Sequence, residues 1–384
     1  MNIWSRNFTT LFISNFLMSF SFYLIIITLP IFANRNLLVE DSKIGLIILT
    51  LSSSAIIGRI LSNYLLNYVK EYSLYLGSFI AFSIFASSFY FVDEFYHILA
   101  LMPFFGLSFG LVSTVVLKIA TELIPKERRA EGVGYFIMNM SLAMALTPFI
   151  ASLLYRHSFS YVFLTVIFLL VIAIYLSVIV DYRSEIKKEK INLSLFFDKK
   201  LLPIFFISIF TLNGYGAIFS FLDIFANSKG IENASLFFLV YSASISITRP
   251  IGGRIFDKYG HFNLMVISFI TLAFGLFMLS NIETLSLLLI SSAFIGVGYG
   301  VLSTSFFALA INQVGEKRKN LANSMIFISI DVGIGCGSFL AGVISTIALD
   351  YIFKFSSMLI ILSLILFILQ SFREKGVNAV KIKG

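Results

Sequence analysis

Two ionisable residues lie inside long apolar segments of this sequence, where charges are uncommon. Asp331 falls about ten residues into the segment 321–348, and Arg249 falls near the end of the segment 234–255. A carboxylate in apolar surroundings can take up a proton or bind a cation, and a guanidinium can pair with a carboxylate or an anionic ligand. The two residues therefore predict ion or ligand binding. Each also has a structural interpretation, as an ion pair between helices or as an arginine that reaches the interface.

Uncharged polar side chains in other apolar segments could complete such a site. Amides can contact a ligand or join two helices by hydrogen bonds, and tyrosine rings can stack on an organic compound. Lys118, near the inner end of its segment, is instead expected to extend toward the polar boundary. The candidates for coupling or substrate binding are Asp331, Arg249, Asn15, Asn139, Asn213, Tyr23, Tyr241 and Tyr299, with Tyr215 as a further aromatic residue.

The sequence lacks the residue patterns of several other kinds of site. The single Cys336 leaves no disulfide within the chain, and His97, His157 and His261 are scattered, so no metal site is expected. No Gly-x-x-x-x-Gly-Lys-Ser/Thr segment for nucleotide phosphates occurs. We expect neither an enzyme nor a bound cofactor.

The elements that must position the candidate residues are membrane-spanning helices. Of the 384 residues, 58% are hydrophobic and only 12% are charged, and the mean hydropathy is +0.95. A soluble protein of this length could not cover its surface with so few charges. About 20 apolar residues span a bilayer as a helix. Twelve such runs are predicted, at 8–32, 43–67, 73–92, 97–120, 132–155, 159–181, 201–226, 234–255, 262–280, 284–312, 321–348 and 351–372.

The placement of positive charge predicts the orientation of these helices. Most of the 28 lysines and arginines, which give a net charge of +8, lie in segments that are cytoplasmic if the N-terminus is inside. Both termini are therefore expected in the cytoplasm, and no nucleic-acid partner is expected. A polar stretch divides the chain into a first six-helix bundle (1–182), a central cytoplasmic loop (183–200), and a second six-helix bundle with a short basic tail (201–384).

The two halves of the sequence repeat one another. The segment 104–132 aligns with 294–322 at an offset of 190 residues, which brings glycines, a Ser-Thr pair and an arginine into register. The stretches Gly58–Leu65 and Gly253–Gly260 both begin Gly-Arg-Ile, and both are expected in loops on the cytoplasmic side. Halves related by an axis along the membrane normal occur in secondary transporters.

These features together resemble the major facilitator superfamily, over essentially the whole chain. Its motif Gly-x-x-x-Asp-Lys-x-Gly is complete at Gly253–Gly260, and Phe22–Phe32, which contains Thr-Leu-Pro, looks like bacterial efflux-type members that export drugs or metallophores. The resemblance implies twelve helices in two six-helix repeats and a conformational switch at the motif. The switch residues would be Gly58, Arg59, Gly253, Arg254, Asp257, Lys258 and Gly260.

The resemblance also implies a function. A multi-pass protein of the cell membrane, acting as a monomer in the lipid bilayer, would export a small drug-like or metallophore-like organic compound by alternating access, with the proton gradient as energy source. One alternative is a nutrient importer of the same fold, working as a symporter or uniporter. Another is a membrane receptor or sensor that uses a transporter scaffold without transporting.

One departure from the family motif generates a test. The first copy carries Ser62 where the family has an acidic residue, so the charged contact is expected in the second copy. Asp257→Asn should therefore lower the initial rate of transport in proteoliposomes several-fold more than Ser62→Ala, at equal amounts of inserted protein. A larger loss at Ser62 would assign the switch to the first copy.

Overall fold

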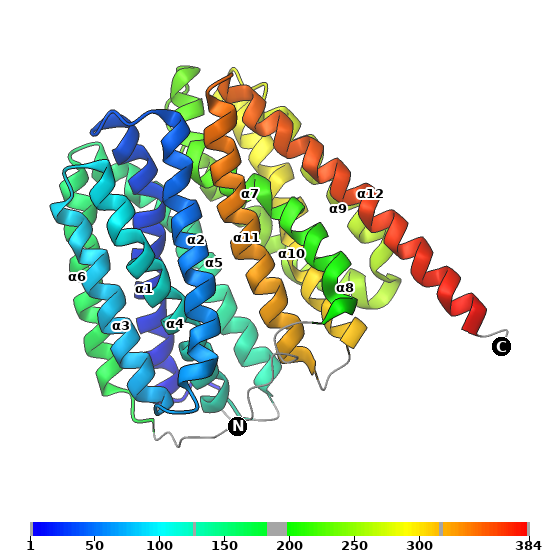
Figure 1. Ribbon diagram of the computed structural model, residues 1–384, viewed down its shortest axis with the longest axis horizontal. Helices are drawn as coiled ribbons and strands as arrows, with labels where there is room; N and C mark the ends of the chain where they lie inside the picture. Colours follow the sequence, from blue (N-terminus) through cyan, green and yellow to red (C-terminus); the bar gives the residue numbers. More distant parts are fainter. Residues whose placement is uncertain (1–2, 126–127, 183–197, 315–317, 382–384) are drawn as a thin grey trace. The chain divides into compact units, whose positions relative to one another are not determined.

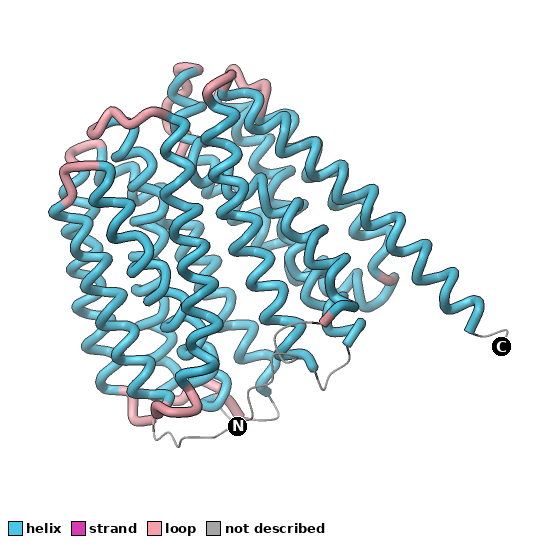
Figure 2. Tube along the Cα trace, viewed as in Figure 1, coloured by secondary structure: helices cyan, strands magenta, loops and turns pink. Residues whose placement is uncertain are grey.

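The computed structural model describes residues 3–125, 128–182, 198–314 and 318–381, and the regular structure in these ranges is helical throughout (Figure 1, Figure 2). Two short 3-10 turns, Phe89–Phe91 and Lys199–Leu201, adjoin longer helices. The α-helices of the described ranges are α1 (Arg6–Arg35), α2 (Asp41–Leu65), α3 (Glu71–Ser88), α4 (Phe95–Leu123), α5 (Arg129–Tyr155), α6 (Phe159–Ile179), α7 (Leu202–Ser228), α8 (Leu236–Tyr259), α9 (His261–Leu279), α10 (Leu285–Val314), α11 (Lys319–Ser345) and α12 (Leu349–Lys381).

The lengths and compositions of these helices confirm the prediction of a multi-pass membrane protein. Eleven described helices are long and apolar enough to cross a membrane. In α8 the apolar part found among the described residues is Leu236–Arg249. Each of the twelve predicted runs coincides with the greater part of one helix.

The two Gly-Arg-Ile stretches lie in helices, so their predicted placement in loops is wrong. Gly58–Leu65 forms the last two turns of α2, and the second stretch ends α8 at Tyr259. Neither stretch contains a proline or a cluster of turn residues that would stop a helix earlier. Gly260, with φ of +82°, alone joins α8 to α9, whereas residues 66–70 separate α2 from α3.

The helices pack into two compact units, residues 1–191 and 192–384. In the first unit, α2 packs on α4, and α1 packs on α5 and α6. In the second unit the corresponding pairs are α8 with α10, and α7 with α11 and α12. Helices α5 and α11 both have 27 residues and begin 190 residues apart. The sequence repeat therefore builds the same arrangement of six helices twice.

Glycines allow the helix backbones of each unit to touch. A Cβ atom added to Gly110 of α4 would overlap the carbonyl oxygen of Ala55 in α2. In the second unit, a Cβ on Gly216 of α7 would overlap the carbonyl oxygen of Ile334 in α11. Between membrane helices there is no hydrophobic driving force, so this close van der Waals contact is a main source of association.

Substitution of one packed glycine should therefore separate two helices. Gly216→Ala should destabilise the purified protein by about 1–3 kcal/mol, the usual effect of overpacking, and should lower its melting temperature in detergent. Gly77→Ala is the matched control, because an added Cβ there meets no atom within 4 Å. Equal melting temperatures for the two variants would contradict the close α7–α11 contact.

Candidate functional site

Three tyrosines from three helices meet inside the second unit. Tyr215 of α7 lies edge-on to Tyr299 of α10, with ring centroids 5.3 Å apart. Tyr241 of α8 lies 5.9 Å from Tyr215 and 6.5 Å from Tyr299. Phe219, one turn along α7, extends the cluster at 4.7 Å from Tyr215. We call Tyr215, Tyr241 and Tyr299 the tyrosine cluster.

The hydroxyls of the tyrosine cluster differ in their hydrogen bonding. Tyr299 donates to the carbonyl oxygen of Thr211 at 3.1 Å. Tyr241 is only 2% exposed. Within the described part of the chain its hydroxyl makes no hydrogen bond of good geometry, although it interacts with the Tyr215 phenol. A buried phenol whose hydrogen bond is poorly formed can donate to a ligand oxygen instead.

Arg249 is the cationic residue on the helix that carries Tyr241. It lies about two turns beyond Tyr241 on α8. Of the residues predicted from sequence, the structure brings Tyr241 and Tyr299 together. Tyr215, named only as a further aromatic, lies at the centre of the group.

Asp331 is partly buried near the middle of α11. The two turns of α11 that follow it pack closely against α7. Gly333 packs on the backbone of Ile209, and Gly337 packs on that of Asn213. Asn213 is itself 5% exposed, and its backbone forms part of this contact. The predicted pairing of Asp331 with Arg249 stays a prediction.

The candidates of the first unit lie on α1 and α5. Asn139 donates from Nδ2 to the carbonyl oxygen of Phe12 at 2.7 Å and so joins the two helices. Asn15 is buried on the same stretch of α1. Tyr23, also on α1, packs edge-on against Phe22 at 5.4 Å. It lies in the first unit, whereas the tyrosine cluster lies in the second.

The switch residues are described in the first copy of the motif and only partly in the second. Gly58 packs against the backbone of Leu107. Arg59 donates to Ser113 Oγ at 3.4 Å, and its guanidinium lies 5.9 Å from the centre of the Phe109 ring. Gly260 is the α8–α9 junction. Gly253 and the side chains of Arg254, Asp257 and Lys258 lie outside the described residues.

A polar network that sequence analysis missed joins α3, α4 and the segment that follows α6. Lys118 is partly exposed, in agreement with the expectation that it extends toward the polar boundary. Its Nζ also lies 2.7 Å from the carboxylate of Glu71, whose side chain is 5% exposed. Tyr182 contacts Glu71 at 2.6 Å and Glu122 at 2.5 Å. Burial, together with the hydrogen bonds to Glu122 and Glu71, raises the pKa of the Tyr182 phenol well above its usual value, so it stays protonated. The i, i+4 spacing of Lys118 and Glu122 was the only signal available in the sequence.

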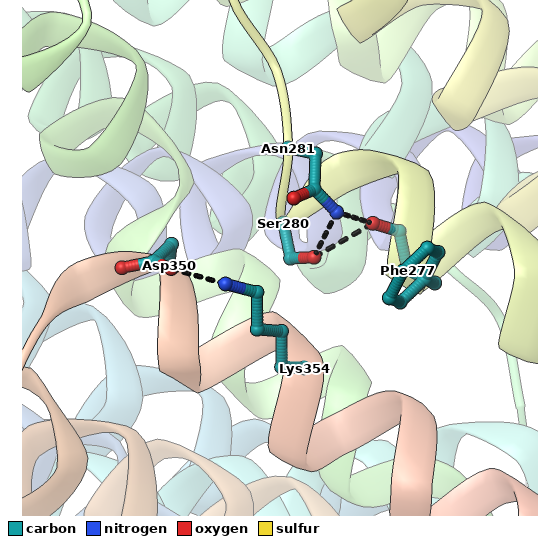
Figure 3. Close-up of polar contacts among 5 residues, drawn as sticks. All are labelled: Phe277, Ser280, Asn281, Asp350 and Lys354. Atoms are coloured by element: carbon teal, nitrogen blue, oxygen red, sulfur yellow. Dashed lines mark hydrogen bonds and ion pairs between the residues drawn. The ribbon is translucent and has the colours of Figure 1, made fainter.

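Helix ends in the second unit carry smaller polar contacts of a purely structural kind. Lys354 pairs with Asp350 at 2.5 Å in the first turns of α12 (Figure 3). Asn281 donates to the carbonyl oxygen of Phe277 at 2.8 Å and lies 2.9 Å from Ser280 Oγ, at the end of α9. These contacts satisfy charges and backbone groups where the helices stop. Among the described residues, no group of three or more His, Cys, Asp or Glu side chains could hold a metal ion.

Comparison with known proteins identifies the family to which this sequence is similar. A sequence profile of the Major Facilitator Superfamily matches residues 11–280 and 204–383. An uncharacterized MFS-type transporter of Methanocaldococcus jannaschii is 24% identical over 305 residues, 76% of this chain and 78% of the relative. The staphylopine export protein of Staphylococcus aureus is 24% identical over 272 residues, 65% of this chain and 67% of the relative.

Solved structures confirm the fold. A POT family transporter in complex with a thioalcohol-conjugated peptide superimposes with a TM-score of 0.82 at 12% identity, over 96% of both chains. The nucleoside transporter NupG superimposes with a TM-score of 0.80 at 13% identity, over 94% of this chain and 99% of that one. At these identities the similarity extends to the fold alone.

The Lys118–Glu71 pair should contribute measurably to stability. Lys118→Met leaves a buried carboxylate without its cation and should destabilise the protein by about 1–3 kcal/mol, less than for a fully buried pair because Lys118 is partly exposed. The measurement is thermal unfolding in detergent. Lys43→Met, which breaks an exposed pair with Glu40, should change stability by less than about 0.5 kcal/mol.

The double variant Lys118→Met/Glu71→Gln should recover most of the lost stability, because the uncompensated charge is then gone. If the single Lys118 variant melts like the Lys43 control, the pair is not a stabilising contact.

Proposed function

Since the chain belongs to the major facilitator superfamily and is therefore a membrane transporter rather than an enzyme, we propose that it exports a small organic compound, driven by the proton gradient. The two halves would expose a central site alternately to the two sides of the membrane. The similarity to the staphylopine export protein supports the outward direction. The observation that carries the proposal is the buried tyrosine cluster of the second unit, with Arg249 about two turns along the same helix as Tyr241.

The chemistry of this cluster favours a compound with an anionic group. Arg249 can pair with a carboxylate, and the Tyr241 hydroxyl is a buried donor that makes no hydrogen bond of good geometry in the described part of the chain. The rings of Tyr215 and Phe219 offer apolar surface beside these donors. A small amphipathic or zwitterionic compound fits such a combination.

Asp331 would couple transport to protons. It lies twelve residues after the start of α11, or about 18 Å along the helix, at a depth where an ionised carboxylate is unfavourable unless it is compensated. Protonation would remove this charge, and Arg249 would respond to the change. The nutrient-importer alternative uses the same residues in the opposite direction, and no described feature favours it.

A growth assay would identify the class of compound. Deletion and overexpression strains are compared on dyes, antibiotics and metal-limited medium. Hypersensitivity to drugs supports drug export, and a defect confined to metal starvation supports metallophore export. Loss of growth on one nutrient would overturn export in favour of import.

Asp331→Asn should abolish transport driven by an imposed pH gradient in proteoliposomes loaded with the compound so identified, while exchange of labelled for unlabelled compound persists. Asp223→Asn is the control, because Asp223 lies near the outer end of α7 and bonds to Asn227. Unchanged gradient-driven transport in the Asp331 variant would remove Asp331 from the coupling mechanism.

Exchange of the two charges tests their pairing. The double variant Arg249→Asp/Asp331→Arg should transport better than either single variant, because it restores opposite charges. A double variant no better than the singles would show that the two residues do not pair.

A further inference from the structure

Two buried amides on the packed helices α1 and α5 have polar atoms left over. Asn139 uses Nδ2 to bond the carbonyl oxygen of Phe12. Asn15 lies three residues after Phe12, on the same face of α1. Across the described residues, neither Asn139 Oδ1 nor Asn15 Nδ2 has a hydrogen-bond partner. The first atom is an acceptor and the second is a donor, so their requirements are complementary.

Ser19 continues this polar face by one more turn of α1. Its hydroxyl is fully buried and likewise lacks a partner in the described ranges. Asn15 and Asn139 are only 3% and 1% exposed. Asn15 is nine residues into α1, or about 14 Å from its start, where neither lipid nor apolar side chains can supply hydrogen bonds. Three unsatisfied groups at this depth are strongly unfavourable unless something binds them.

In the second unit, the equivalent interface shows no such unpaired atoms among the residues that the structure describes. Ser329, which lies 190 residues after Asn139, is 2.6 Å from Ser208 Oγ and 2.7 Å from the carbonyl oxygen of Ile326. Gly333 and Gly337 then bring α11 against the backbone of α7.

At the positions of these two glycines, α5 carries Ala143 and Thr147. The backbones of α1 and α5 cannot approach as closely as those of α7 and α11. The α1–α5 interface therefore has both the unpaired polar atoms and the larger side chains, and the α7–α11 interface has the smaller ones.

We infer that Asn15, Ser19 and Asn139 form a binding site for a small neutral molecule that both donates and accepts hydrogen bonds, and that this molecule is water. It accepts from Asn15 Nδ2, donates to Asn139 Oδ1, and has Ser19 Oγ as a third partner. About three polar partners are usual for a buried water. A cation would oppose the amide donor and an anion would oppose the amide acceptor, so a neutral molecule fits best.

The site goes beyond the proposed function, because it is occupied without any transported compound. A bound water can exchange hydrogen bonds as two helices shift, whereas a glycine contact is lost when its helices separate. The α1–α5 interface would thus be hydrated, whereas α7 and α11 meet through glycine contacts and paired serines.

X-ray radiolysis with mass spectrometry tests this site in the full-length protein in nanodiscs, in buffer without added compounds. Hydroxyl radicals that form from a bound water oxidise the side chains beside it, and methionine is a sensitive reporter. Met18, one turn from Asn15 and 1% exposed, is the reporter, and Met102 of α4, at 0% exposure, is the buried control. Met18 should be oxidised several times faster than Met102, and equal rates in the unaltered protein would overturn the inference.

The variant Asn15→Leu/Asn139→Leu separates bound water from solvent that enters an opened cavity. Removal of the amides should bring oxidation of Met18 down to the rate of Met102. Unchanged oxidation of Met18 would show that cavity solvent is responsible, and would overturn the inference. Asn139→Ser, which installs the residue found in the second half, gives the same reading if the double variant does not fold.

Discussion

Backbone-to-backbone contact between helices is the interaction on which each half of this protein depends. In a bilayer the lipid tails are as apolar as the side chains, so helices associate through close packing and hydrogen bonds rather than through burial from water. Gly110 brings α4 against α2, and Gly216 brings α7 against α11. Gly214, also on α7, lies where a Cβ would press on the Tyr299 hydroxyl. The packing of α7 therefore also sets the geometry of the tyrosine cluster.

Buried polar groups fall into two kinds: those whose hydrogen bonds are formed within the protein, and those that can still form one with a ligand. Glu71 is buried, but Lys118 and Tyr182 satisfy it, so it holds three segments together. Tyr241 is equally buried, yet within the described ranges its hydroxyl makes no hydrogen bond of good geometry. This distinction, rather than burial alone, separates structural polar residues from candidates for binding.

Much of the fold follows from the sequence, because apolar runs of bilayer length and the placement of lysine and arginine leave few alternatives. The 190-residue offset likewise predicts the paired arrangement of α5 and α11. The site follows less readily, because helices that are apolar on all sides give no indication of which face turns inward. Tyr215 was therefore undervalued, and the partner of Lys118 was missed because Glu71 lies 47 residues earlier on another helix. The loop assigned to Gly58–Leu65 failed for a simpler reason, since glycine and serine are tolerated within a helix that tertiary packing supports.

The junctions after α2 and α8 differ although they occupy equivalent positions in the repeat. The first junction, residues 66–70, is a turn in which Leu66, Tyr68 and Val69 donate backbone hydrogen bonds to carbonyls at the end of α2, whereas Gly260 alone, at positive φ, makes the second. A turn of several residues can accommodate an inserted epitope or protease site. The second junction cannot, because its single residue must keep a positive φ that only glycine adopts without strain.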